Sequence, residues 1–166
     1  MTDPIIIVDF KDADRGDWLV INDGVMGGRS RCTFERTDDQ TGLFSGALSL
    51  ENEGGYAATR ASIGIHDLSP HSGLEIRVRG DGRTYQFRLR TDDNFDGVSY
   101  RVLFDTTAGE WVTARFPFKD FLPIFRGRIL EYEAPMDTSQ IQQVVFLLAD
   151  RKAGPFSLEI DFVRTW

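Results

Sequence analysis

Residues 74–90 decide the fold class, and they read LEIRVRGDGRTYQFRLR. Residues 74–79 and 84–90 each alternate apolar and polar side chains with a period of two, which places the apolar side chains of each run on one face of a β-strand. The turn between them, Gly80-Asp81-Gly82, consists of residues that tolerate the backbone conformations of hairpin turns. We therefore predict a β-hairpin with one face in a hydrophobic core.

Similar runs precede and follow this hairpin. They cover residues 5–10, 30–36, 43–50, 55–63, 100–105, 111–116 and 156–162, and residues 142–149 form a nearly continuous apolar run, as expected of a strand buried on both faces. Helix signals are limited to single turns, one after Pro117 at residues 119–121 and one capped by Asp137. About ten short strands separated by turn residues are typical of a sandwich. The fold class is therefore predicted to be all-β, one antiparallel β-sandwich.

The composition limits the class of protein. The 166 residues suffice for one domain, predicted to span 1–166. A net charge of −7 opposes nonspecific nucleic-acid binding. Cys32 is the only cysteine, so no internal disulfide forms, and the N-terminus lacks the basic start and apolar core of a signal peptide. No run approaches the ~20 apolar residues of a transmembrane helix. These features predict a cytoplasmic protein without a transmembrane segment.

Motifs for catalysis or nucleotide binding are absent from the sequence, which contains no G-x-S-x-G, G-x-G-x-x-G or P-loop. His66 and His71 are the only histidines, too few to build a zinc site without further ligands. Residues 92–97 resemble the opening of a calcium loop, but Leu103 stands where the bidentate acid is expected, which favours an ordinary turn. We therefore predict a protein that is not an enzyme and holds no metal or cofactor.

Arginine dominates the basic residues, since only three of the 19 are lysine. Several arginines occupy the non-core face of the predicted strands: Arg77, Arg79, Arg88, Arg90 and Arg101. One interpretation is a surface that binds carbohydrate or small anions, flanked by Gln86, Trp111 and Tyr132. The interpretation that we favour is a set of cross-strand ion pairs with Glu75, Asp105, Glu159 and Asp161.

Two glycine-rich stretches, NDGVMGGRS at residues 22–30 and NEGGY at residues 52–56, are able to bring backbone amides close to a ligand or to another backbone. With their surroundings they resemble the CIA30 family, the complex I intermediate-associated protein 30 domains. The resemblance rests on WLVINDGVMGGRS at 18–30, FSGALSLEN at 44–52, GGY at 54–56, Arg60, RGDGRTY at 79–85, FRGR at 125–128 and GPF at 154–156.

This resemblance implies a galactose-binding-domain-like jelly roll and a non-catalytic, protein-binding role. Mitochondrial members of the family are assembly factors that act as chaperones on intermediates of respiratory complex I, the NADH:ubiquinone oxidoreductase, so subunits or intermediates of that complex are the expected partners. A carbohydrate- or small-anion-binding module is the alternative. The family motifs carry the candidate binding residues, which are Asn22, Asp23, Met26, Gly27, Gly28, Ser30, Arg60, Arg79, Asp81, Arg83 and Arg126.

Overall fold

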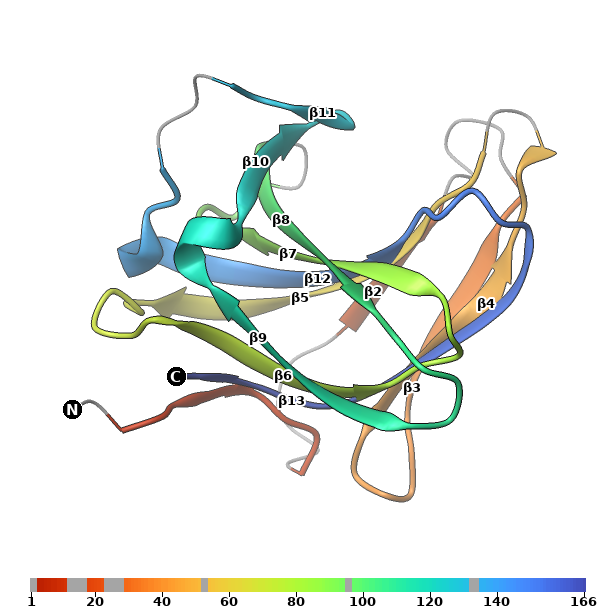
Figure 1. Ribbon diagram of the computed structural model, residues 1–166, viewed down its shortest axis with the longest axis horizontal. Helices are drawn as coiled ribbons and strands as arrows, with labels where there is room; N and C mark the ends of the chain where they lie inside the picture. Colours follow the sequence, from red (N-terminus) through yellow and green to blue (C-terminus); the bar gives the residue numbers. More distant parts are fainter. Residues whose placement is uncertain (1–2, 12–17, 23–28, 52–53, 95–96, 132–134) are drawn as a thin grey trace.

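The computed structural model describes residues 3–11, 18–22, 29–51, 54–94, 97–131 and 135–166, and it consists of two antiparallel β-sheets that pack face to face (Figure 1). The first sheet has the strand order β3-β4-β13-β6-β9, and β1 also pairs with β13. Its strands are β1 (Ile6–Val8), β3 (Arg31–Arg36), β4 (Gly42–Leu48), β6 (Gly73–Arg79), β9 (Trp111–Pro117) and β13 (Gly154–Thr165).

The second sheet has seven strands in the order β11-β10-β8-β7-β12-β5-β2. Its strands are β2 (Trp18–Asn22), β5 (Ala57–His66), β7 (Thr84–Arg90), β8 (Ser99–Asp105), β10 (Leu122–Phe125), β11 (Arg128–Ile129) and β12 (Ile141–Leu148). The strand β12 lies in the middle of this sheet and is buried over most of its length, which confirms the prediction for residues 142–149. The predicted all-β antiparallel sandwich is therefore confirmed.

The local predictions are correct for most elements. Each predicted strand is present, and the two predicted helical turns appear as short 3-10 helices, η3 (Phe118–Asp120) and η4 (Thr138–Gln140). Asp137 caps η4, since its side chain accepts hydrogen bonds from the backbone N–H and the hydroxyl of Ser139. The strands β2, β10 and β11 were not predicted, because each is short and shows no sustained alternation.

The predicted hairpin at residues 74–90 is wrong. The strands β6 and β7 belong to different sheets, and the turn at residues 80–82 carries the chain from one sheet to the other. The return connection between β8 and β9 runs beside it: the Thr106 hydroxyl accepts from the backbone N–H of Gly82 and donates to the carbonyl of Arg83. Alternation marks the face of a strand that is buried but not its partner strand, so both sheets satisfy the pattern.

The core lies between the two sheets, and aromatic side chains join them. Phe87 of β7 and Phe116 of β9 have ring centroids 6.1 Å apart, and Trp18 of β2 stacks on Phe34 of β3 at 4.7 Å. Such pairs add about 0.5–1.5 kcal/mol beyond the apolar area that they bury. The inward faces of both sheets are thereby fixed, which leaves the two outer faces available for function. Among the described residues, no helix is both long and apolar enough to cross a membrane.

Candidate binding face of the seven-stranded sheet

The outer face of the seven-stranded sheet carries a row of side chains in register across six strands. Direct strand pairing aligns Leu19, Arg60, Val145, Arg88, Arg101 and Leu122, from β2 through β5, β12, β7 and β8 to β10. Side chains directly opposite one another on one face of a sheet lie about 4.5–5.5 Å apart at Cβ, so this row is continuous. It places three arginines between two exposed leucines.

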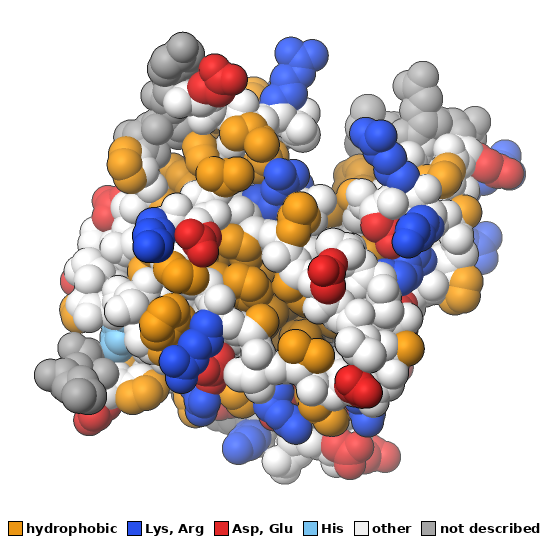
Figure 2. Space-filling view, viewed as in Figure 1, with side chains coloured by type: hydrophobic (Ala, Val, Ile, Leu, Met, Phe, Trp, Pro, Cys, Tyr) orange, Lys and Arg blue, Asp and Glu red, His pale blue; other side chains and the backbone are white. Residues whose placement is uncertain are grey.

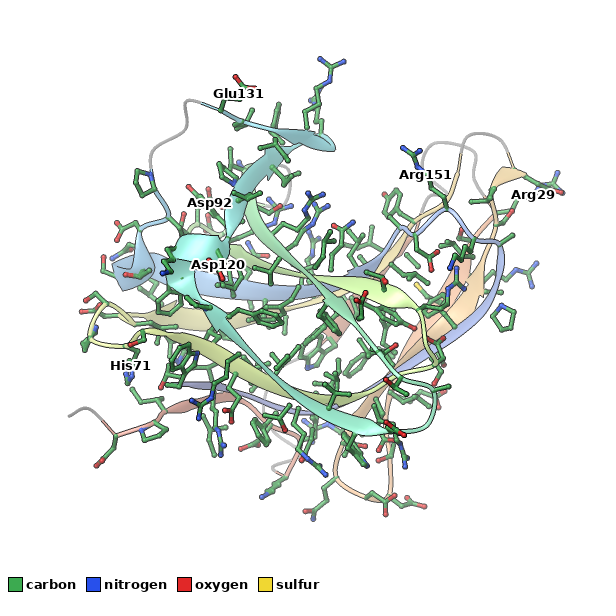
Figure 3. All side chains as sticks on the ribbon, viewed as in Figure 1. Arg29, His71, Asp92, Asp120, Glu131 and Arg151 are labelled. Carbon is green, nitrogen blue, oxygen red and sulfur yellow. The ribbon has the colours of Figure 1, made fainter. Side chains whose placement is uncertain are left out.

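This outer face is hollowed. The strands β10 and β11 rise above the sheet at one side (Figure 1), and Figure 2 shows an indentation at the top of the view over the middle strands. Figure 3 places Glu131 at one side of the indentation and Arg29 and Arg151 at the other. A concave surface with polar groups on its floor is a common form of binding site.

A pocket of about 180 Å³ lies on this face. Its lining residues are Ile21, Tyr56, Ala58, Arg60, Arg88, Arg90, Val145 and Leu147. Ile21 immediately precedes the glycine-rich stretch at 22–30, and Tyr56 ends the one at 52–56, so a described residue at the edge of each stretch lines the pocket. None of the described residues that line it is acidic.

The electrostatics of the pocket follow from burial and from like charges. Arg88 donates two hydrogen bonds to Gln86 Oε1, at 3.0 and 2.6 Å, and one to the Ser99 hydroxyl at 3.4 Å, all neutral acceptors. Burial, followed by repulsion from Arg101 and Arg90, lowers the pKa of Arg88 to about 10. Burial and Arg90 also lower the pKa of Arg60. Burial and the like charge of neighbouring arginines therefore both act on the guanidinium groups of this pocket.

The arginines of the six-stranded sheet behave differently. Arg77 pairs with Asp161 at 2.7 Å and Arg79 with Glu159 at 2.5 Å, while both guanidinium groups lie over the ring of Trp111. Cross-strand ion pairs, the interpretation favoured from the sequence, are therefore correct for these two arginines. The predicted five-arginine surface does not exist, because Arg88, Arg90 and Arg101 lie on the other sheet.

Two further predicted site residues, Asp81 and Arg83, hold the beginning of β13. The Arg83 guanidinium donates two hydrogen bonds to the Asp150 carboxylate, at 2.8 and 2.6 Å. It also donates to the backbone carbonyls of Lys152, Gly154 and Pro155. Asp81 accepts from the Tyr85 hydroxyl and from the backbone N–H of Ser157. Burial, reinforced by Asp81, raises the pKa of Tyr85, so that hydroxyl remains a donor. Both residues are engaged within the fold.

The remaining predicted site residues are distributed as follows. Ser30 is buried and exchanges hydrogen bonds with the backbone of Ser49. Arg126 lies in the β10–β11 turn, exposed, with its guanidinium 5.2 Å from the Phe125 ring centroid. Asn22 ends β2 and pairs with Ala57. Asp23, Met26, Gly27 and Gly28 lie outside the described residues.

Sequence reasoning named Arg60, Arg88, Arg90 and Arg101 but not the pocket that joins three of them. It also missed the apolar residues of this face, among them Val145, Leu147 and Leu19. The available signal was the apolar run at 142–149, half of which must face outward. Only the order of the strands in the sheet brings these residues together.

Metal ligands do not gather in the described part of the chain, where no group of three or more His, Cys, Asp or Glu side chains could hold an ion. In the stretch that resembles a calcium loop, Asp92 accepts a hydrogen bond from the backbone N–H of Asn94, and Gln143 donates to the carbonyls of both residues. The third expected ligand, Asp96, lies outside the described residues.

The fold defines a class of protein. The structure superimposes with a TM-score of 0.71 on a family 11 carbohydrate-binding module of the cellulosomal cellulase Lic26A-Cel5E from Clostridium thermocellum, over 99% of this chain and 95% of that one. The sequence identity is 16%, so the likeness concerns the fold. The chain is a jelly-roll β-sandwich of the galactose-binding-like type.

The family follows from the sequence. A profile of the family described as complex I intermediate-associated protein 30 (CIA30) matches residues 8–160, and the chain belongs to this family. It is 31% identical over 170 residues to the mitochondrial complex I intermediate-associated protein 30 of Mus musculus, covering 90% of this chain and 52% of the relative. The corresponding protein of Drosophila melanogaster is 30% identical over 181 residues, with 95% and 61% covered. The chain thus spans between half and two thirds of the length of these relatives.

These relatives correct one prediction from the sequence. Both are named as mitochondrial proteins, as is the relative from Neurospora crassa, and this contradicts the predicted cytoplasmic location. The prediction rested on the lack of a basic start and an apolar core in the first residues, and that feature carries no information on where the members of this family are located.

Proposed function

We propose that this protein is a non-catalytic assembly factor that binds an intermediate of respiratory complex I through the outer face of its seven-stranded sheet. The names of the relatives, which describe association with complex I intermediates, support the first part of this proposal. The second part rests on the contrast between the two outer faces of the sandwich.

The single observation that carries the proposal is the mixed arginine and leucine composition of the candidate face. Leu19, Leu103 and Leu122 are 50%, 55% and 45% exposed, and all three extend from strands of the seven-stranded sheet beside its arginines. Protein interfaces are enriched in arginine and apolar side chains and depleted of acidic ones. On the six-stranded sheet, Arg77, Arg79 and their acidic partners already satisfy one another.

The charge of this face favours an acidic partner and one orientation of that partner. The protein carries a net charge of −7, whereas the row across the seven-stranded sheet presents Arg60, Arg88 and Arg101. A cationic face on an acidic protein orients an acidic partner during encounter and repels it elsewhere, which increases the association rate and the specificity more than the affinity.

Carbohydrate binding receives less support from this face. Sugar platforms are exposed aromatic rings. The described outward-facing positions of β2, β5, β7, β8 and β12 carry no aromatic side chain, and Tyr56, directly before β5, is the aromatic residue among those that line the pocket. Trp111, one of the platforms considered from the sequence, lies on the other sheet beneath Arg77 and Arg79. Tyr132 lies outside the described residues.

Affinity capture with matched charge reversals tests the proposal. Arg101→Glu alters the candidate face, and Arg31→Glu alters an exposed strand arginine of the six-stranded sheet. Tagged protein captured from solubilised membranes of the native host should enrich complex I subunits, and Arg101→Glu should reduce the enrichment about fivefold or more while Arg31→Glu has little effect. Equal losses in both variants, or no enrichment with the wild-type protein, would contradict the proposal. Thermal unfolding of each variant confirms that it is folded.

A further inference from the structure

We infer that the outer edge of β9 is a docking site for the same edge of a second copy of this chain, so that two six-stranded sheets join into one. The strand β9 ends its sheet, and among the described strands only β6 pairs with it. With seven residues it is the longest of the described strands that lie at a sheet edge. The inference concerns the sheet opposite the proposed complex I face and goes beyond that association.

The backbone of β9 presents hydrogen-bonding groups along this edge. Gly73 of β6 uses both of its backbone groups on Trp166: its N–H donates to the Trp166 carbonyl at 3.3 Å, and its carbonyl accepts from the Trp166 N–H at 3.1 Å. It therefore makes no backbone hydrogen bond to Pro117, its partner on β9. Bonded and non-bonded pairs alternate along an antiparallel ladder, so every second residue of β9 points its backbone groups away from β6. These residues are Trp111, Thr113 and Arg115.

The sequence of β9 does little to protect this edge. Exposed edges are usually protected by lysine, a bulge, a proline within the strand or a short length. β9 contains no lysine, its register with β6 has no irregularity, and its one proline, Pro117, stands at the end of the strand. Backbone groups at such an edge readily pair with another strand.

The inner face of β9 is incompletely covered. Ala114 and Phe116 pack against the core but are only half-buried, and Val112 is half-buried as well. The residues paired with Val112 and Ala114 on β6, which are Val78 and Ile76, are completely buried. A strand added beside β9 would shield this apolar margin of the core from water.

The order of the side chains favours a second copy as the added strand. An antiparallel pair centred on Thr113 brings together all the outward backbone groups of both copies, with Thr113 opposite Thr113 and Trp111 opposite Arg115 on each side. Threonines directly opposite one another stabilise a sheet, and an arginine is attracted to an indole ring. On the inner face, Val112 meets Ala114. A pair centred on Arg115 would instead place two like charges opposite each other.

Sedimentation equilibrium of the purified protein over a wide range of concentrations tests the inference. We expect a reversible equilibrium between monomer and dimer. Thr113→Lys places two ammonium groups opposite each other at the centre of the interface and should raise the dissociation constant about tenfold or more. Thr33→Lys is the matched control, because it makes the same change at an exposed position of β3 at the other end of this sheet. It should change the dissociation constant less than about twofold.

Disulfide trapping tests the register. Thr113→Cys should give a covalent dimer on oxidation, since directly bonded partners in an antiparallel ladder lie about 5.5 Å apart at Cα, within the reach of a disulfide. Thr33→Cys and the wild-type protein, which contains Cys32, should not.

Three results would overturn the inference: a wild-type protein that stays monomeric, equal weakening by Thr113→Lys and Thr33→Lys, or trapping at position 113 no faster than at position 33. A monomeric protein would assign the edge to a strand of a different protein. None of these results affects the capture experiment with complex I, which depends on the other sheet.

Discussion

Arginine side chains lie in two kinds of surroundings in this protein. Arg115 and Arg164 both donate to the buried carboxylate of Glu75. Burial raises the pKa of Glu75, but the hydrogen bonds and positive charges of the two arginines together lower it overall. Arg60 and Arg88 instead line a pocket in which none of the described lining residues is acidic. The first group stabilises the sandwich, and the second lies on the candidate binding face.

The Arg83–Asp150 pair gives the sharpest prediction at this scale. Both side chains are about nine-tenths buried, and although burial raises the pKa of Asp150, its bonds from Arg83 and the Lys152 backbone lower it overall. The pKa of Asp150 is thus lower in the folded protein than in the unfolded chain, where it is about 3.9. The pair therefore stabilises the protein fully at pH values above the unfolded pKa, and this contribution is lost as the pH falls through the folded pKa. Asp150→Asn should reduce the free energy of unfolding by about 3 kcal/mol at neutral pH.

Urea unfolding at several pH values measures this effect. The wild-type protein should lose stability between about pH 5 and pH 2, and Asp150→Asn should lose less over the same interval. Asp120→Asn, which alters an exposed acid, is the control and should follow the wild-type curve. Parallel curves for wild type and Asp150→Asn would show that Asp150 does not carry the pH dependence.

At the scale of the elements, the backbone of β3 lies so close to Gly46 of β4 that no side chain fits at this position. Gly46 pairs with Cys32 of β3 and Phe156 of β13, and a Cβ atom there would lie 1.9 Å from the backbone oxygen of Arg31. Gly46→Ala should therefore destabilise the protein by about 3 kcal/mol, because the backbone of β3 must move.

The β10–β11 turn provides the contrast. Arg126 and Gly127 both have positive φ, 51° and 79°, as a two-residue hairpin turn requires, and a Cβ at Gly127 would meet open space. Gly127→Ala should cost only about 1 kcal/mol, from backbone strain alone. Urea midpoints compare the two variants, and a cost at Gly127 equal to that at Gly46 would refute the steric argument.

Elements with strong alternation could be predicted from the sequence, and their partners could not. Residues 84–90 and 99–105 show the period of two clearly, and both are strands with the expected inward faces. The turn at residues 80–82 looks local, yet its interactions with Thr106 belong to a crossing between the sheets. The strands β10 and β11 are too short to carry a pattern. Pairing with β8 defines β10, and pairing with β10 defines β11.

At the scale of the whole molecule, the two outer faces differ in a way that composition conceals. A net charge of −7 describes neither the ion-paired face of the six-stranded sheet nor the arginine row of the other. The sequence identified the arginines and the CIA30 motifs. It did not reveal that Arg60 and Arg88 meet across β12, because this depends on the strand order.

The central claim is that the outer face of the seven-stranded sheet contacts the complex I intermediate. The most direct measurement is photo-crosslinking in the native host with benzoylphenylalanine in place of Leu103 on this face, or in place of Thr113 on the opposite sheet; both positions are exposed. We predict crosslinks to complex I subunits from position 103 and none from position 113. Crosslinks from position 113 with none from position 103 would contradict the account and place the partner on the six-stranded sheet.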